Sequence, residues 1–218
     1  MTPGDPSPAI IDGDMAELEI HPLTPERLDD LGTLFGQGGD PKWCWCAYFR
    51  VRGMNWANST PEQNRAVLTR ATEAGYKAGR APGLVAYRAG EAVGWVGLSP
   101  REEYERLEHS VVLRRVDDKP VWSIVCFVVG RRARGQGVAR ALLDAAVDYA
   151  RDHGATLLEA YPVDTAGRRL PAANAYHGTL SMFEDAGFRV VERRRFNRSS
   201  PERPIVRRRV RPRRSARG

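Results

Sequence analysis

Apolar positions along the chain alternate or recur at helical spacing, and they predict strands and helices in a mixed order. In the first half we expect a strand, a short helix, an aromatic segment, a longer helix and a hairpin, over residues 18–23, 25–35, 37–58, 59–78 and 84–98. The longer helix opens with Ser59-Thr60-Pro61-Glu62, which predicts Ser59 as its cap and Glu62 as the partner in a capping box.

The second half begins with the most β-branched run of the chain, residues 121–129, which predicts a central strand. A helix, a strand, a second helix and two closing strands are expected after it, over 136–153, 156–163, 174–186, 188–195 and 204–210. Strand, helix and strand in this order predict one parallel strand pair joined by a right-handed crossover. The order indicates a single α/β domain.

The length of 218 residues, with 42% hydrophobic and 28% charged positions, is typical of one soluble domain. We expect a leader at 1–17 rich in Pro, Gly and Asp, the domain at 18–210 and a tail at 211–218. No apolar stretch approaches the roughly 18–20 residues of a membrane span, and the start of the chain has no signal-peptide pattern. These features predict a cytoplasmic protein with no membrane partner.

The net charge of +7 is concentrated at the C-terminal end. Residues 189–218 contain 13 Arg against two Glu, so they carry +11 and leave −4 for the other 188 residues. Because Phe196 is the single aromatic residue of this segment and no nucleic-acid-binding fold is recognisable, we expect a solvated strand edge and tail rather than a nucleic-acid surface.

Three cysteines, Cys44, Cys46 and Cys126, are too few and too unevenly placed for a disulfide framework, and they favour a reducing compartment. Two of them lie in Trp43-Cys44-Trp45-Cys46, but the four histidines offer no spacing that would complete a metal site. We therefore expect no metal. The aromatic residues of this segment predict either core packing or a wall of a binding pocket for an apolar or cationic amine.

A basic, glycine-containing turn joins the central strand to the following helix, with the sequence Arg132-Ala133-Arg134-Gly135-Gln136-Gly137. The first amides of a helix have no intrahelical acceptor, and the helix dipole favours negative charge at that end. Glycines let a phosphate approach the backbone closely. The turn therefore predicts a diphosphate site, although it lacks the third glycine of a dinucleotide fingerprint and the Gly-Lys-Ser/Thr of a Walker loop.

This turn resembles the acetyl-CoA signature Arg/Gln-x-x-Gly-x-Gly/Ala of the GNAT acetyltransferase superfamily, and the strand before it, Leu142-Leu143 after it and Ala186-Gly187-Phe188 follow the family order. The resemblance implies a mostly antiparallel sheet with a splayed parallel strand pair at the cofactor, flanked by helices. It implies acetyl-CoA as co-substrate, with no metal. The residues that it assigns to cofactor binding are Phe127, Val128, Val129, Arg132, Arg134, Gly135, Gln136, Gly137, Val138, Ala139 and Asn174.

The resemblance also implies direct attack of an amine on the thioester, helped by a backbone N–H near Val128, a base and an acid. The family's acid is a tyrosine, but Phe183 stands at its position. Tyr176 is the candidate replacement, because seven residues before Phe183 is close to two turns of the expected helix. Glu159, or a carboxylate among Glu102, Glu103 and Glu105, is the candidate base.

The resulting hypothesis is an N-acetyltransferase that acts on the primary amine of a small molecule. Two alternatives stay open: acetylation of protein or peptide amines, and a GNAT-like domain that senses acyl-CoA without catalysis, which Phe183 suggests. Because domains of this family often pair, a homodimer is a candidate oligomeric state.

Overall fold

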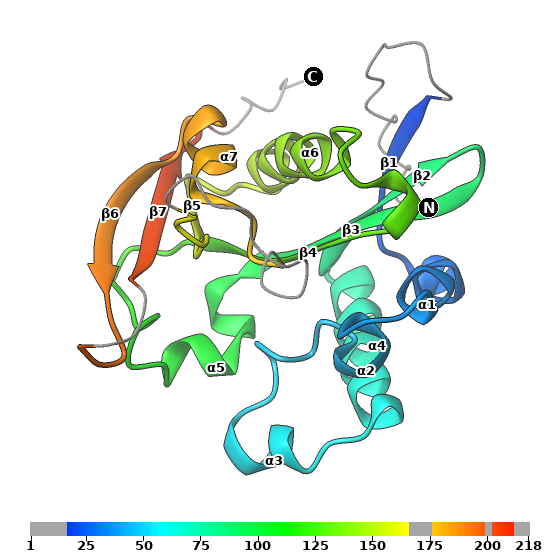
Figure 1. Ribbon diagram of the computed structural model, residues 1–218, viewed down its shortest axis with the longest axis horizontal. Helices are drawn as coiled ribbons and strands as arrows, with labels where there is room; N and C mark the ends of the chain where they lie inside the picture. Colours follow the sequence, from blue (N-terminus) through cyan, green and yellow to red (C-terminus); the bar gives the residue numbers. More distant parts are fainter. Residues whose placement is uncertain (1–16, 166–175, 199–201, 212–218) are drawn as a thin grey trace.

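The computed structural model describes residues 17–165, 176–198 and 202–211, and its centre is a seven-stranded sheet (Figure 1). The strand order is β1-β2-β3-β4-β5-β7-β6. The strands are β1 Leu18–Pro22, β2 Gly83–Arg88, β3 Glu91–Pro100, β4 Trp122–Val129, β5 Leu157–Ala160, β6 Arg189–Arg194 and β7 Arg203–Arg209. Neighbouring strands are antiparallel except β4 and β5, which pair in parallel. The expected mixed sheet with one parallel pair is confirmed.

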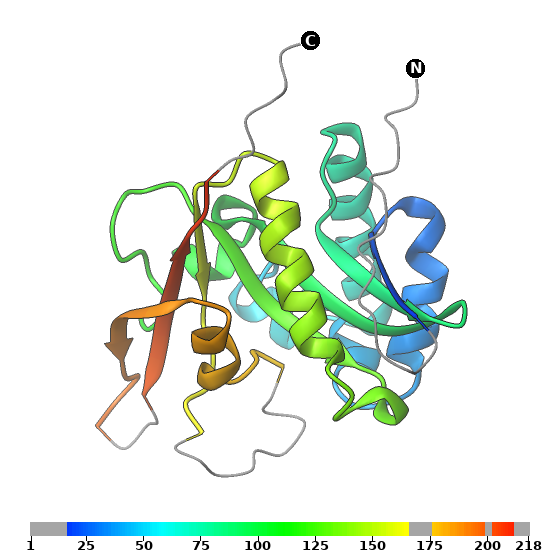
Figure 2. The same ribbon diagram turned by 90° about the horizontal axis from the view of Figure 1, so that it is seen from above.

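Helices cover both faces of this sheet. The α-helices are α1 Leu28–Gly36, α2 Pro41–Cys44, α3 Gly53–Ala57, α4 Pro61–Lys77, α5 Glu105–Glu108, α6 Val138–Asp152 and α7 Leu180–Asp185, and the 3₁₀ turns are η1 Pro25–Arg27, η2 Arg101–Glu103 and η3 Arg131–Ala133. Helices α6 and α7 lie on one face, and α1 to α5 lie on the other (Figures 1 and 2). The chain therefore has three layers, with the sheet between two layers of helices.

Two apolar clusters fill the spaces between these layers. The first lies under α6 and α7 and includes Phe127, Leu142 and Phe183. The second lies on the α1 side and includes Phe35, Trp95 and Tyr104. Helix α6 supplies seven buried residues to the first cluster, because its apolar positions recur at helical spacing. The sheet thus separates two environments, which we call the α6 face and the α1 face.

The start of α4 differs in detail from the prediction. Thr60, not Ser59, is the N-cap: its hydroxyl accepts from the Gln63 amide, and the Gln63 side chain accepts from the Thr60 amide. Pro61 therefore occupies the first helical position, where its missing N–H costs nothing. The Ser59 hydroxyl instead donates to the Trp56 carbonyl.

The C-terminal basic segment is more engaged than the expected solvated edge. Arg208 donates to the Ala186 carbonyl, Arg194 to the carbonyls of Arg114 and Arg115, and Arg207 is buried. Strand β7 lies between β5 and β6, so its inward side chains belong to the interior. The leader and tail lie outside the described residues except for Glu17 and Arg211. Across the described parts of the chain, no helix is long and apolar enough to cross a bilayer.

Candidate functional site

The turn between β4 and α6 presents the backbone that the sequence predicted for a diphosphate. Gly135 and Gly137 both have left-handed backbones, with φ of +75° and +77°, and a Cβ at either position would meet nothing within 4 Å. Gly137 is the N-cap of α6. Glycine therefore provides both the conformation and an open approach to the backbone.

The amides of this turn are free of competing acceptors. Within the described residues, no carbonyl outside the helix accepts from the amides of residues 134–139. The side chains of the turn hold its shape: Arg134 donates to the Val129 carbonyl, and Gln136 donates to the Arg132 carbonyl and accepts from Arg88. At the N-terminus of the 15-residue helix α6, these amides and the helix dipole make the turn a candidate anion site.

Strand β4 contains a β-bulge, which precedes this turn in the chain. Gly97 pairs with Cys126 and Leu98 with Ile124, so Val125 is an extra residue. As a consequence, Val125 and Cys126 both pack on the α1 face, although they are consecutive, while Ile124 and Phe127 pack on the α6 face. The bulge redirects the strand where β4 and β5 separate.

The two parallel strands are paired over only three residues each, Trp122–Ile124 and Leu158–Ala160. Beyond them, no described strand continues the pairing of β4 on this side, which we call its open edge. The Gly130 amide donates to the Val93 carbonyl of β3, so strand alternation also points the Val128 amide toward β3. The amides of Phe127 and Val129 therefore point toward the open edge, and they are the outward donors near Val128.

The segment after residue 175 enters this edge. The Phe127 amide donates to the Tyr176 carbonyl at 2.6 Å, and the Val163 amide donates to the Gly178 carbonyl at 3.0 Å. Residues 176–178 thus lie between β4 and the chain that follows β5. A cofactor that bonds to the Phe127 amide must displace the Tyr176 carbonyl, whereas the Val129 amide stays clear of this contact.

The helix predicted over 174–186 is wrong in extent. Helix α7 begins at Leu180, with Thr179 as its N-cap, and Gly178 has a left-handed φ of +73° that breaks any helix before it. Tyr176 is consequently not on one helical face with Phe183. Phe183 is fully buried on the α6 face, and Tyr176 packs on the α1 face. Asn174 lies outside the described residues.

Aromatic side chains from three parts of the chain gather on the α1 face around the bulge. Tyr48 contacts Phe49 and Trp56 edge-on, and Phe49 contacts Tyr104 in the same way. Two guanidinium groups lie on these rings: Arg106 is 4.1 Å from the centre of Tyr48, and Arg50 is 4.6 Å from that of Tyr104. The predicted aromatic wall is present as packing, and its cation-binding faces already hold arginines of the chain.

Tyr176 joins this aromatic group. Burial, followed by the neighbouring Tyr48, raises the pKa of its hydroxyl to about 12, so the hydroxyl stays protonated at neutral pH. Its ring lies 4.0 Å from that of His177, centre to centre. A protonated hydroxyl at this place is able to donate a proton or a hydrogen bond.

His177 is the residue of this site that sequence reasoning did not select. Its side chain is only 8% exposed, its ring bonds to the Val125 carbonyl at the bulge, and its Nδ1 has no hydrogen-bond partner among the described residues. Burial, followed by Arg203, lowers the pKa of the imidazole to about 3, so it is neutral. A lone histidine in a sequence has no periodic or spacing signal that would distinguish it.

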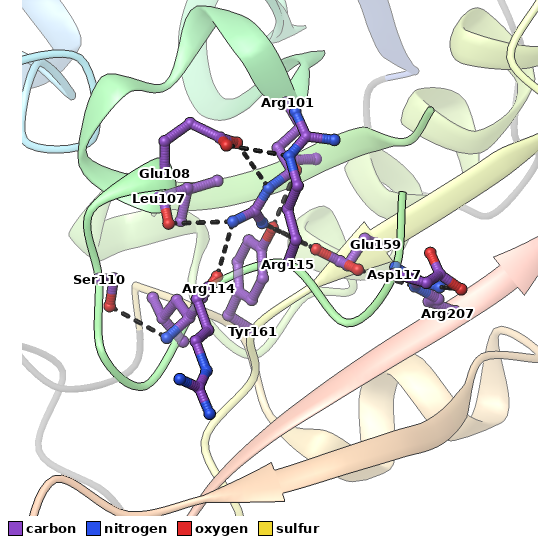
Figure 3. A network of polar contacts seen from close by, with 12 residues as sticks. Arg101, Leu107, Glu108, Ser110, Arg114, Arg115, Asp117, Glu159, Tyr161 and Arg207 are labelled. Atoms are coloured by element: carbon purple, nitrogen blue, oxygen red, sulfur yellow. Dashed lines mark hydrogen bonds and ion pairs between the residues drawn. The ribbon is translucent and has the colours of Figure 1, made fainter. Parts of the chain in front are cut away.

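The structure assigns Glu159 to a different place. It is fully buried, and both of its oxygens are occupied: Oε1 accepts from Arg101 Nη1 at 2.9 Å and from the Tyr161 hydroxyl at 2.7 Å, and Oε2 accepts from Arg207 Nε at 2.7 Å (Figure 3). A general base needs a free lone pair within reach of the substrate. Both oxygens of Glu159 are already engaged, and its assignment as the base stays a prediction.

Two of the three alternative carboxylates are engaged as well, and the third, Glu105, is exposed at the start of α5. Glu103 pairs with Arg50 and Arg80, and Glu102 pairs with Arg115 at the surface. Arg101, at the centre of the network in Figure 3, also donates to Glu108 and to the carbonyls of Leu107 and Leu113. This network connects the 101–117 segment to β5 and β7, and its evident role is structural.

The three thiols come together on the α1 face. Cys46 Sγ lies 2.8 Å from Cys126 Sγ, and the Trp95 indole donates to Cys46. All three cysteines are free. Among the residues that the structure describes, no group of three or more His, Cys, Asp or Glu side chains is arranged to hold a metal ion.

These features define a class of protein: a mixed α/β domain with a glycine-containing turn of unpaired amides next to a bulged, splayed strand. A profile of the Acetyltransferase (GNAT) family matches residues 46–178. The chain is similar to the GCN5-related N-acetyltransferase from Kribbella flavida, with a TM-score of 0.54 at 19% identity, over 88% of this chain and 98% of that one.

Two further structures share the fold. The GNAT domain of PAT from S. lividans has a TM-score of 0.55 at 19% identity, covering 93% of this chain and 97% of that one. The polyamine N-acetyltransferase from Drosophila melanogaster, which catalyses formation of N-acetylagmatine, has a TM-score of 0.54 at 11% identity, covering 88% and 100%. A comparison with curated proteins found no match in sequence. The chain belongs to the GNAT acetyltransferase family.

Proposed function

We propose that this acetyltransferase moves the acetyl group of acetyl-CoA to the primary amine of a small molecule, by direct attack in a ternary complex. The observation that carries the proposal is the turn at residues 134–139, where unpaired amides, two left-handed glycines and the start of α6 form one anion site. The family uses acetyl-CoA, whose diphosphate matches this site in charge.

The cofactor would bind with its diphosphate on the amides of Arg134 to Ala139 and with the charges of Arg132 and Arg134 nearby. Its pantetheine arm would run along the open edge of β4 toward the bulge, where the Val129 amide points outward and the Phe127 amide stays bonded to the Tyr176 carbonyl. The cofactor supplies the activated acetyl group. The protein's contribution is to orient the two substrates and to stabilise the developing oxyanion with a backbone N–H.

Tyr176 is the proposed acid. In the transfer, the amine nitrogen forms a bond to the thioester carbon, the carbon–sulfur bond breaks, and the leaving sulfur takes a proton. The raised pKa of Tyr176 keeps its proton available, and its ring lies on the same face as the bulge. A soluble cytoplasmic enzyme with a small-molecule acceptor, as a monomer or a homodimer, completes the proposal.

A matched pair of variants tests the cofactor site. Gly137 and Gly154 lie at opposite ends of α6, both have left-handed φ, and a Cβ at either meets nothing within 4 Å. Asp tolerates this backbone better than most residues. Gly137→Asp places a negative charge at the proposed diphosphate site, so its calorimetric Kd for coenzyme A should rise at least about tenfold. Gly154→Asp should bind like the wild type.

If both variants bind coenzyme A equally well, or the wild type does not bind it, the proposed site is wrong. Thiol release from acetyl-CoA over a panel of amines then separates the functions. Turnover of small amines supports the proposal, and acetylation of peptides alone, detected by intact mass, supports the second candidate. Binding without turnover of any acceptor indicates the acyl-CoA sensor.

A further inference from the structure

A buried polar atom without a partner faces the aromatic side of the bulge. His177 Nδ1 has no hydrogen-bond partner among the described residues, although its side chain is 8% exposed. Leaving a buried polar atom unsatisfied costs about 1–3 kcal/mol. Such an atom in a folded protein is often completed by a ligand or water.

The protonation of Nδ1 follows from the hydrogen bond that the other ring nitrogen makes. The Val125 carbonyl takes the ring's one N–H, and since Nδ1 is the atom without a partner, the N–H is on Nε2. Nδ1 of a neutral imidazole with that tautomer carries a lone pair and accepts a hydrogen bond. The atom therefore matches a donor such as an amine N–H, and not an anion.

A second buried polar residue lies close by. Tyr104 is 1% exposed, and its hydroxyl interacts with the Ser99 side chain. The Phe49 ring contacts both residues, at 5.6 Å from the His177 ring and 6.4 Å from the Tyr104 ring, centre to centre. The unpartnered imidazole nitrogen and a buried phenol thus flank one aromatic ring beside the bulge of β4.

The charge around this place is positive. The Arg106 guanidinium donates only to the carbonyls of Tyr48 and Val51, and no carboxylate of the described residues lies within ion-pair distance of it. Arg50 shares its carboxylate, Glu103, with Arg80. An acceptor with additional positive charges would be repelled here, whereas a neutral or anionic molecule would not.

We infer that His177 Nδ1 accepts a hydrogen bond from the amine of the acceptor substrate and so positions its nitrogen for attack, and that this amine belongs to a neutral or anionic small molecule. The inference rests on the proposed function and specifies its acceptor side. The hydrogen bond fixes one N–H and leaves the nitrogen lone pair directed to the thioester carbon. As the new carbon–nitrogen bond forms, the nitrogen loses one proton, and the leaving coenzyme A thiolate gains one.

Two amide variants separate positioning from structure. His177→Gln places a polar group at the site of Nε2, so it preserves a donor to the Val125 carbonyl but removes the acceptor at Nδ1. His177→Asn places a polar group at the site of Nδ1 and removes the donor to Val125. His153→Gln is the matched control, because His153 is exposed at the end of α6.

Steady-state acetyl transfer is measured with phenylethylamine, an amino acid and spermidine, together with the melting temperature of each variant. We expect His177→Gln to melt like the wild type and to raise the KM for the amine about tenfold, with the KM for acetyl-CoA unchanged. His177→Asn should keep an amine KM closer to the wild type and melt at a lower temperature. Spermidine should be the poorest acceptor.

The inference would be overturned if His177→Gln had wild-type kinetics, or if both variants lost activity in proportion to the fall in their melting temperatures. Either result would leave the proposed function standing. Preference for spermidine would overturn the assigned acceptor class. If the wild type transfers acetyl to none of the amines, the proposed function itself is wrong, and the inference fails with it.

Discussion

Replacing the Glu159 carboxylate by the neutral amide of Gln removes one charge from a buried network and leaves the volume unchanged. Glu159 is 0% exposed, and it pairs with Arg101 at 2.9 Å and with Arg207 at 2.7 Å. Removing one partner of a buried ion pair costs about 3–5 kcal/mol. Arg101 keeps Glu108 and Arg207 keeps Asp117, so we expect the lower part of that range.

For a domain of this size, each kcal/mol lowers the melting temperature by about 2–4 °C, so Glu159→Gln should lower it by at least about 6 °C. Asp144→Asn is the control, because Asp144 pairs with Arg140 at the surface of α6 and such a pair contributes below about 1 kcal/mol. Circular dichroism follows unfolding, and acetyl transfer is measured well below the melting temperature. An unchanged melting temperature with a large loss of kcat would support Glu159 as the base and refute the structural role.

Three further predictions concern other parts of the site. Gly94→Ala would place its Cβ 2.7 Å from Val138 Cγ1 and 2.9 Å from Leu142 Cδ1, so it should displace the start of α6, cost about 1–3 kcal/mol in urea unfolding and weaken coenzyme A binding. Wild-type values for both would contradict this packing. Burial holds the pKa of His177 at about 3, below its ordinary 6.5, so the unfolded chain binds the proton first and stability falls as the pH drops below 6.5. Between pH 7 and 5, the free energy of unfolding of the wild type should fall by up to about 1.4 kcal/mol per pH unit more than that of His177→Gln. If the free energies of unfolding of the two proteins fall in parallel with pH, the imidazole is not buried and neutral. The Cys46–Cys126 contact predicts that hydrogen peroxide converts these two thiols to one disulfide with release of two waters, reducing the thiols titrated after unfolding from three to one; three remaining thiols would contradict the contact.

The elements with strong local signals were predictable from the sequence. Strand β4 is a long β-branched run, and α6 combines helical spacing with a glycine at each end. Both formed within two residues of the expected bounds, and the turn between them contains the two expected glycines, each with a left-handed backbone. These features depend on neighbours in the chain, which a sequence shows directly.

The site residues that depend on distant contacts were not predictable. Glu159 was predicted only as a candidate base, because its partners, Arg101 and Arg207, lie 58 and 48 residues away in the sequence. Strand β7 inserts next to β5 and brings Arg207 against it. The Arg-rich end of the chain was expected at the surface for the same reason: nothing local shows that one of its arginines neutralises a buried carboxylate.

The error at residues 174–186 changes how the catalytic candidates are held. A helix would have fixed Tyr176 relative to Phe183, on the α6 face. Instead the Phe127 amide binds the Tyr176 carbonyl and the Val125 carbonyl binds the His177 ring, so β4 holds both residues from its bulge, on the opposite face. The family position occupied by Phe183 is buried in the core and has no access to a substrate. The absence of a tyrosine there is therefore no argument against catalysis. The segment bonded to β4 supplies the protonated hydroxyl of Tyr176 and the lone pair of His177 Nδ1, near the place where the acetyl group is proposed to lie.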